Sequence, residues 1–142
     1  MQAGLSLYDM RMPFSERKIR HYTEGDCWAL AIAVSELTGY PLYGVGYRDE
    51  RGVDPNERYW CHIVVQVADD AYLDVRGVRN SEEVFAEFTK FGGEMFPMVK
   101  ANLQDSIDDI DLYGFIFCES WDVVKADAAE LVSTYLPAWA VA

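Results

Sequence analysis

Residues 26–39 read Asp-Cys-Trp-Ala-Leu-Ala-Ile-Ala-Val-Ser-Glu-Leu-Thr-Gly and contain the longest apolar run of this 142-residue chain. A helix that is apolar on most of its faces lies at the centre of a domain. Asp26 is a favourable residue to precede a helix, and Gly39 is a favourable residue to follow one. The stretch therefore predicts a buried central helix over residues 27–38, with Cys27 in its first turn.

The length and composition of the chain favour one folded domain. Hydrophobic residues make up 51% of the 142 residues, which is the composition of a protein with its own core. Repeats, linkers and low-complexity segments are not apparent in the sequence. We therefore expect residues 1–142 to form a single α+β domain.

Hydrophobic periodicity and turn residues predict further elements around the central helix. Residues 59–67 and 72–76 read as two strands joined by a short turn, the second ended by Gly77. Residues 102–111 read as an acidic connection with at most one helical turn. The remaining expected elements are strands over 41–47, 94–99 and 113–118 and helices over 14–21, 80–91 and 120–135.

Charge and apolar run lengths exclude several classes of partner. The chain has 24 acidic and 12 basic residues and a net charge of −12, which argues against a nucleic-acid partner. Apolar runs of about eight residues are too short to span a bilayer, so we expect no membrane partner. The first residues lack a secretory leader pattern, and the chain has three cysteines. These features predict a cytoplasmic protein with free thiols.

Cys27 is the candidate nucleophile because of its expected position at a helix start. A thiol attacks as its thiolate, and the partial positive charge and unpaired N–H groups of a helix N-terminus stabilise that anion. Gly25 lets the chain bend just before the helix and lets a substrate approach the backbone. The negative charge of Asp26 opposes thiolate formation unless it points away or caps the helix.

His62 and Asp74 are the candidate base and its orienting carboxylate. Side chains alternate along a strand, so His62 faces away from its neighbour Cys61. A hairpin centred on residue 68 places Asp74 directly across from His62, and one centred on residue 69 places it one diagonal step away. In both registers the two side chains lie on one face and can meet. The order cysteine, histidine, aspartate is that of a thiol nucleophile, its base and the base's orienter.

Acyl chemistry also needs donors for a developing oxyanion. The backbone N–H of Cys27 is one donor, and His21, Tyr22 and Thr23 are the available upstream donors, which the sequence does not rank. Trp28 is expected to form a pocket wall or part of the core.

The stretch Gly25-Asp26-Cys27-Trp28-Ala29 resembles the G-x-C-W-A signature around the nucleophile of papain-type enzymes. The order of Cys27, a strand carrying His62 and a strand carrying Asp74 is similar to the transglutaminase-like branch of the papain-like superfamily. The match covers about residues 21–77. Papain-type enzymes carry a glutamine for the oxyanion six residues before the cysteine, and this chain has His21 there.

The resemblance implies a papain-like core, in which a cysteine-headed helix packs on a small antiparallel sheet, followed by C-terminal helices. It implies hydrolysis or transfer at an amide, isopeptide or thioester of a peptide or protein substrate, without a metal or cofactor. Gln66 and Tyr72 share the face of His62 and are further candidates for substrate contact. The alternatives are a catalytically inactive interaction module on the same fold and an acyltransferase that uses a thioester donor.

Overall fold

A computed structural model describes residues 14–48, 58–89, 93–98, 100–118 and 120–136 of the chain. The helices are α2 (Glu16–Glu24), α3 (Cys27–Thr38), α4 (Ser81–Phe88), α5 (Lys100–Tyr113) and α6 (Trp121–Tyr135). The strands are β1 (Leu42–Arg48), β2 (Arg58–Ala68), β3 (Ala71–Asp74), β4 (Gly77–Arg79) and β5 (Glu94–Pro97).

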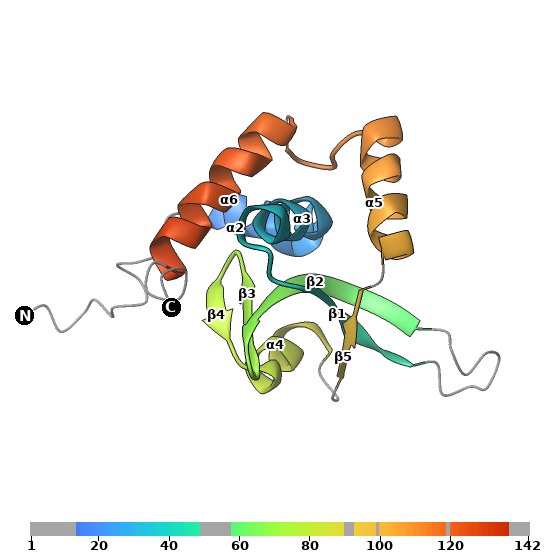
Figure 1. The fold of residues 1–142 in the computed structure, drawn as a ribbon, viewed down its shortest axis with the longest axis vertical. Helices are drawn as coiled ribbons and strands as arrows, with labels where there is room; N and C mark the ends of the chain where they lie inside the picture. The colour runs from blue at the N-terminus through green and yellow to red at the C-terminus, as the bar shows by residue number, and fades with distance from the viewer. Residues whose placement is uncertain (1–13, 49–57, 90–92, 99, 119, 137–142) are drawn as a thin grey trace, which may run out of the picture.

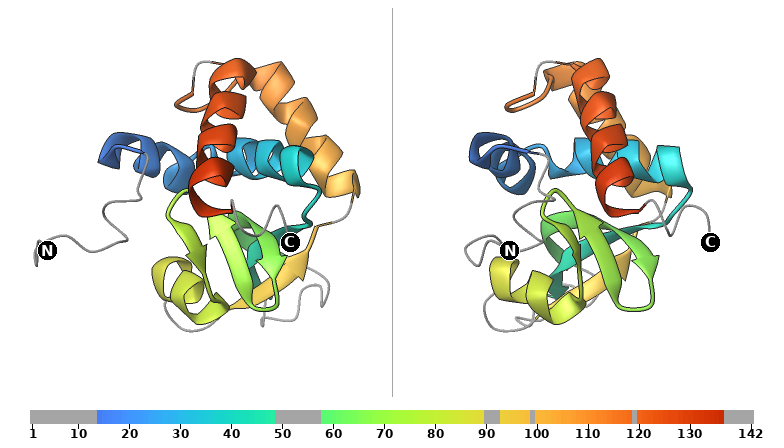
Figure 2. Two further views of the ribbon diagram at one scale, coloured as in Figure 1. Left: turned by 60° about the vertical axis from the view of Figure 1, so that its left-hand side comes forward. Right: turned by 90° about the vertical axis from the view of Figure 1, so that its left-hand side faces the viewer.

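The strands form one antiparallel sheet in the order β4-β3-β2-β1-β5. Helix α3 lies across one face of this sheet, with α6 and α5 on either side of it, and α4 covers part of the opposite face (Figure 1). Helix α2 leads into the start of α3 (Figure 2). The expected α+β class is confirmed, and α3, which begins at Cys27, contacts the sheet at β2.

Helix α3 has the predicted bounds, residues 27–38, and its C-terminal cap and its buried residues are those that the sequence predicts. It begins at Cys27 and ends at Thr38, and the following Gly39 has a φ of 81°, in the left-handed region that favours glycine. Six consecutive residues from Ala29 to Val34 are buried. An apolar surface on every side explains why other elements surround this helix.

The sheet has a different apolar cluster on each of its two faces. Ile63, Val65 and Val67 of β2 belong to the main core, which includes α3 and α6. Val64 alternates with them and packs in a second cluster with Val84 of α4. Because side chains alternate along a strand, His62 belongs to the α4 face of the sheet.

The β2–β3 hairpin has the second of the two expected registers. Gln66 pairs with Tyr72 and Val65 with Leu73, so the hairpin is centred on residue 69. Asp74 then lies one diagonal step from His62. Strand β3 ends at Asp74, so His62 lies beyond the last β2–β3 pair, at an open end of the ladder.

The sequence does not predict strand β4, and the second strand of the hairpin ends at Asp74, two residues before the expected end at residue 76. The chain turns at Val75 and Arg76, and β4 then begins at Gly77, with a φ of 106°. Asp74 pairs with Gly77 across this turn. The sequence predicts that Gly77 ends a strand, whereas its left-handed backbone begins a return strand that carries Arg79.

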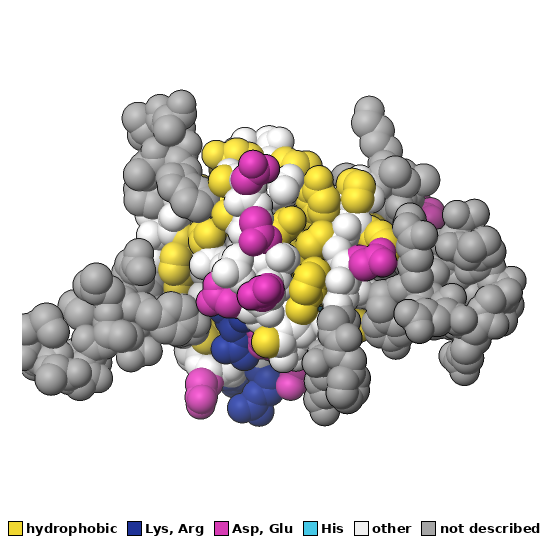
Figure 3. Space-filling model, turned by 90° about the horizontal axis from the view of Figure 1, so that it is seen from below, with side chains coloured by type: hydrophobic (Ala, Val, Ile, Leu, Met, Phe, Trp, Pro, Cys, Tyr) yellow, Lys and Arg dark blue, Asp and Glu magenta, His cyan; other side chains and the backbone are white. Residues whose placement is uncertain are grey.

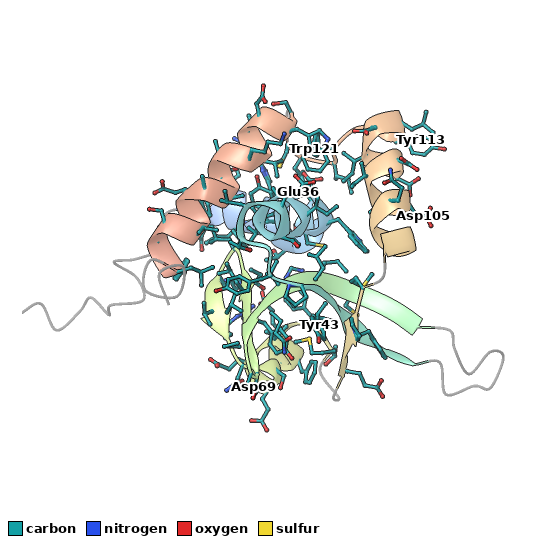
Figure 4. All side chains as sticks on the ribbon, in the orientation of Figure 1. Glu36, Tyr43, Asp69, Asp105, Tyr113 and Trp121 are labelled. Carbon is teal, nitrogen blue, oxygen red and sulfur yellow. The ribbon has the colours of Figure 1, made fainter. Side chains whose placement is uncertain are left out.

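The prediction for residues 102–111 was wrong, because they belong to the 14-residue helix α5. Its acidic residues interrupt the hydrophobic pattern in the sequence. Ile107 and Ile110 nevertheless lie three positions apart and pack against the main core. Asp105 and Tyr113 point away from the body of the protein (Figure 4).

The predicted strand over residues 113–118 is also wrong. Gly114 follows α5 with a φ of 85°, which ends the helix and turns the chain. The backbone N–H groups of residues 116–118 are bound by the carboxylate of Asp26 and are therefore taken up outside the sheet. The alternation of side chains in residues 113–118 does not reveal that Asp26 binds their backbone in place of a neighbouring strand.

The surface carries the excess of acidic residues expected from the sequence. Seen from below the sheet, acidic side chains are spread over the face and Lys and Arg side chains gather at one edge (Figure 3). None of the helices among the described residues is long and apolar enough to cross a membrane.

Candidate active site

Cys27 lies at the first position of α3 and is half-buried. It lines a small internal cavity together with Tyr22, His62 and Asp74. The structure therefore brings the three predicted catalytic side chains to one place, although they come from three different elements.

His62 and Asp74 form a buried pair. The Nε2 atom of His62 lies 2.9 Å from Oδ2 of Asp74, and the two side chains are 1% and 4% exposed. This pairing assigns the proton on Nε2 and leaves Nδ1 as the nitrogen that can face a thiol. Nδ1 is buried without a well-aligned hydrogen-bond partner in the described part of the chain.

The carboxylate of Asp74 has two further partners. The Nη2 atom of Arg79 donates to Oδ2 over 2.8 Å, and the backbone N–H of Arg76 donates to Oδ1 over 2.9 Å. Glu87 of α4 forms ion pairs with both arginines, at 2.9 Å from Arg79 and 2.6 Å from Arg76. These contacts fix the orientation of the carboxylate toward His62.

Phe88 at the end of α4 covers the imidazole ring of His62. The two ring centroids are 4.0 Å apart and the planes differ by 14°, so the rings are stacked. An aromatic face attracts a cation, and this contact therefore favours the protonated imidazole as well as fixing its plane. Phe88 lies within the helix predicted over residues 80–91, and the hydrophobic pattern of that helix does not reveal this contact.

The pKa values of the pair are shifted in opposite directions. Burial lowers the pKa of His62, but the hydrogen bond to Asp74 and the interaction with Cys27 outweigh it and raise the pKa to about 9. Burial raises the pKa of Asp74, and the hydrogen bond to His62 and the charge of Arg79 reverse this and lower it. At neutral pH the pair is an imidazolium and a carboxylate, and an imidazolium stabilises a neighbouring thiolate.

We expect this raised pKa to make the stability of the protein depend on pH. The pKa of His62 in the fold, about 9, exceeds its ordinary value of 6.5, so the protonated ring stabilises the fold fully below pH 6.5. The stabilisation is lost as the pH rises toward 9. Urea denaturation should show a fall in unfolding free energy of about 3 kcal/mol across this range.

His62→Gln should remove this dependence, and parallel curves for the two proteins would contradict the expectation. The chain has two histidines, so an NMR titration of the unmodified protein resolves the question even if the variant fails to fold. Of the two imidazoles, the buried one should remain protonated well above pH 7.

Asp26 has a different role from the expected helix cap. Its carboxylate makes no cap hydrogen bond in α3. It accepts hydrogen bonds from the backbone N–H groups of Ile116 at 2.9 Å and of Phe117 and Cys118 at 2.8 Å each. Three amide dipoles thus offset the charge that opposes thiolate formation, and the first N–H groups of α3 receive no side-chain cap from Asp26.

Glycine is needed at position 25, two residues before Cys27, for a reason that the sequence does not reveal. Gly25 has a φ of −151° and a ψ of −42°, so its φ lies outside the left-handed region that favours glycine. A Cβ atom there would lie 2.7 Å from the ring of Phe117. The chain does turn here between α2 and α3, and the close approach of the loop after α5 leaves no room for a Cβ atom at this position.

The structure separates the upstream donor candidates. The ring of His21 stacks on Phe117 at 5.0 Å and lines a hollow with Cys118, away from the cavity of Cys27. Tyr22 does line that cavity, but its hydroxyl donates to Asp127 over 2.6 Å. The uncapped N–H groups at the start of α3 therefore remain the best-placed donors.

The other predicted contact residues lie apart from Cys27. Trp28 forms a wall of a hollow of about 300 Å³ between α3 and α5. Gln66 and Tyr72 interact with each other across the hairpin, and the ring of Tyr72 packs edge-on against Tyr43 at 5.9 Å. They share the sheet face of His62 but lie toward the opposite end of β2.

The two remaining cysteines have less reactive surroundings. Cys61 is exposed as a residue, but partial burial of its thiol still raises the pKa of that thiol. Burial also raises the pKa of Cys118, to about 11, although the neighbouring Tyr22 hydroxyl opposes this shift. Within the described ranges, no group of three His, Cys, Asp or Glu side chains is arranged to hold a metal ion.

Comparisons with family models, with curated proteins and with solved structures give no match to this chain. The site is therefore interpreted from its own geometry.

Proposed function

We propose that this protein is a thiol hydrolase or transferase that forms an acyl-enzyme on Cys27. The observation that carries the proposal is the buried His62–Asp74 pair, 2.9 Å apart, beside the cysteine at the start of α3. The substrate class is a peptide or protein amide, isopeptide or glutamine side-chain amide. We also propose a reducing, cytoplasmic environment, in keeping with three free cysteines.

In the proposed reaction the Cys27 thiolate attacks the carbonyl carbon, and the thiol proton resides on His62. Backbone N–H groups at the start of α3 stabilise the oxyanion. Collapse of the tetrahedral intermediate breaks the C–N bond, and the imidazolium gives its proton to the leaving amine. Water or a second amine, deprotonated by His62, then attacks the thioester and releases Cys27.

An interaction module without catalysis is the alternative, and one observation favours it. Leu112, Tyr113 and Ile116 are 73%, 79% and 67% exposed, which is unusual for large apolar side chains gathered in one segment. In this alternative Cys27→Ala retains partner binding and phenotype. An acyltransferase with a thioester donor would use the same nucleophile and base.

Selective alkylation tests the proposal without a known substrate. At pH 7 we expect iodoacetamide to modify Cys27 at least about tenfold faster than Cys61 or Cys118, because only Cys27 has an imidazolium neighbour. Peptide mass mapping of time points gives the three rates. The selectivity should extend down to pH 6, where ordinary thiols are almost unreactive.

His62→Gln should bring the rate of Cys27 down toward that of the other cysteines. His21→Gln is the matched control, since it removes the other histidine of the chain and should leave the rate unchanged. Equal alkylation of Cys27 and Cys61 in the unmodified protein would refute the proposed function.

A further inference from the structure

Helix α5 presents a continuous stripe of exposed side chains on its outward face. The members of this stripe lie three or four positions apart in the sequence and therefore share one side of the helix. The opposite side of the helix packs against the main core through Ile107 and Ile110. We call the stripe the α5 surface, and it consists of Asp105, Asp108, Asp109, Leu112 and Tyr113.

The C-terminal end of the α5 surface is apolar. Leu112, Tyr113 and, in the following loop, Ile116 are the three most exposed large apolar side chains of the described ranges. Large apolar side chains gathered in this way mark interaction sites on proteins. Tyr113 points away from the body of the protein, so its ring is available to a partner (Figure 4).

A hollow of about 300 Å³ lies beside this apolar end, between α5 and the start of α3. Trp28 and Ala29 line it from α3, Ile110 and Tyr113 line it from α5, and Ile116 lines it from the loop. Apolar surface of a partner that enters such a hollow is removed from water. Central side chains anchored in this way contribute most of the affinity of a protein interface.

The remaining part of the α5 surface is acidic. Asp105, Asp108 and Asp109 are exposed, and residues 104–113 contain four aspartates and no lysine or arginine. Asp109 also lines the hollow. A partner that contacts both parts of the surface therefore needs basic side chains next to an apolar one.

Charge also distinguishes between the possible occupants of the α5 surface. A two-fold contact between copies of this chain would bring the acidic stripe against itself. A lipid surface with anionic headgroups would be repelled in the same way. The net charge of −12 on the whole chain adds to both effects. A basic protein segment is the occupant that both parts of the surface attract.

We propose that the α5 surface is the docking site for a basic segment of another protein, which places an apolar side chain in the hollow beside Trp28. The inference goes beyond the proposed function, because it requires no reaction at Cys27. It also gives a role to the loop after α5, whose backbone N–H groups at Ile116 and Phe117 are bound by Asp26. That loop forms the edge of the docking site.

Binding of model helical peptides tests the inference. Three fluorescein-labelled peptides would repeat the heptad Leu-Lys-Lys-Leu-Leu-Lys-Leu, its glutamate version Leu-Glu-Glu-Leu-Leu-Glu-Leu or its serine version Ser-Lys-Lys-Ser-Ser-Lys-Ser. In fluorescence anisotropy we expect the leucine–lysine peptide to bind at least about tenfold tighter than either of the others, because it alone matches both the apolar and the acidic part of the surface.

Two matched pairs of variants locate the binding. Leu112→Ala should weaken binding of the leucine–lysine peptide about fivefold. Leu37→Ala removes an exposed leucine near the C-terminal end of α3 and should leave the affinity unchanged. Asp109→Lys should weaken binding about threefold or more. Glu130→Lys makes the same charge change on an exposed residue of α6 and should have a smaller effect.

Amide NMR shifts give a second measurement that needs no variant. The shifts that the leucine–lysine peptide causes in the unmodified protein should centre on residues 105–117. Shifts centred elsewhere, equal affinities for the three peptides, or equal losses within either pair of variants would overturn the inference. Dimers in sedimentation, or binding to phosphatidylcholine vesicles, that Leu112→Ala abolishes would also overturn it, because a second copy or a lipid surface would then be the occupant.

Discussion

Replacing Asp74 with alanine is expected to lower the unfolding free energy by about 3–5 kcal/mol, because it breaks a buried network of charges. The substitution removes the acceptor of both His62 and Arg79, whose side chains are 1% and 15% exposed. Glu87 remains as a partner of Arg79, whereas Nε2 of His62 loses the partner that the structure shows. Urea denaturation at pH 7 measures the loss.

The same variant should also lose the alkylation selectivity of Cys27, because the hydrogen bond that orients the His62 ring toward the thiol is then absent. Asp74→Asn keeps the shape and one acceptor, so we expect a smaller loss of stability and a partial loss of selectivity. Asp69→Ala is the control, since Asp69 lies exposed at the hairpin turn (Figure 4) and should change stability by less than about 0.5 kcal/mol. An Asp74→Ala protein as stable as Asp69→Ala would argue against the buried network.

The central part of the fold follows from local patterns in the sequence. The apolar run of α3 and the glycine at position 39 define one helix, and the alternation in β2 places His62 on the opposite face from Ile63. Asn80 and Glu83 form the capping box that their spacing predicts at the start of α4. These features are local, so a single sequence reveals them.

The surroundings of the catalytic groups depend on contacts between distant residues. Arg79 reaches Asp74 only because an unpredicted turn at Val75 and Arg76 returns the chain as β4. Phe88 has the spacing of an ordinary core residue, and only the packing of α4 under β2 brings it to His62. Sequence patterns therefore identify His62 and Asp74 as candidates. They do not identify the residues that contact this pair, Arg79 and Phe88.

Asp26 provides the clearest case of a long-range partner, and its removal should be costly. Asp26→Ala leaves three backbone N–H groups about 90 residues away without their acceptor, and we expect a loss of roughly 3–4 kcal/mol in unfolding free energy. The side chain is buried, at 4% exposure of the residue, so water replaces it poorly. Urea denaturation at pH 7 gives the magnitude.

Amide hydrogen exchange distinguishes this cause from a general loss of stability. In Asp26→Asn, where one oxygen is retained, the amides of Ile116, Phe117 and Cys118 should exchange faster while those of Ala31 and Ile32 in α3 stay protected. Asp122→Ala in the first turn of α6 removes an exposed carboxylate and should alter neither set of amides. Unchanged exchange at all three loop amides would show that Asp26 does not hold the loop. Faster exchange confined to that loop would show that Asp26, which directly precedes Cys27, holds the loop after α5 in place.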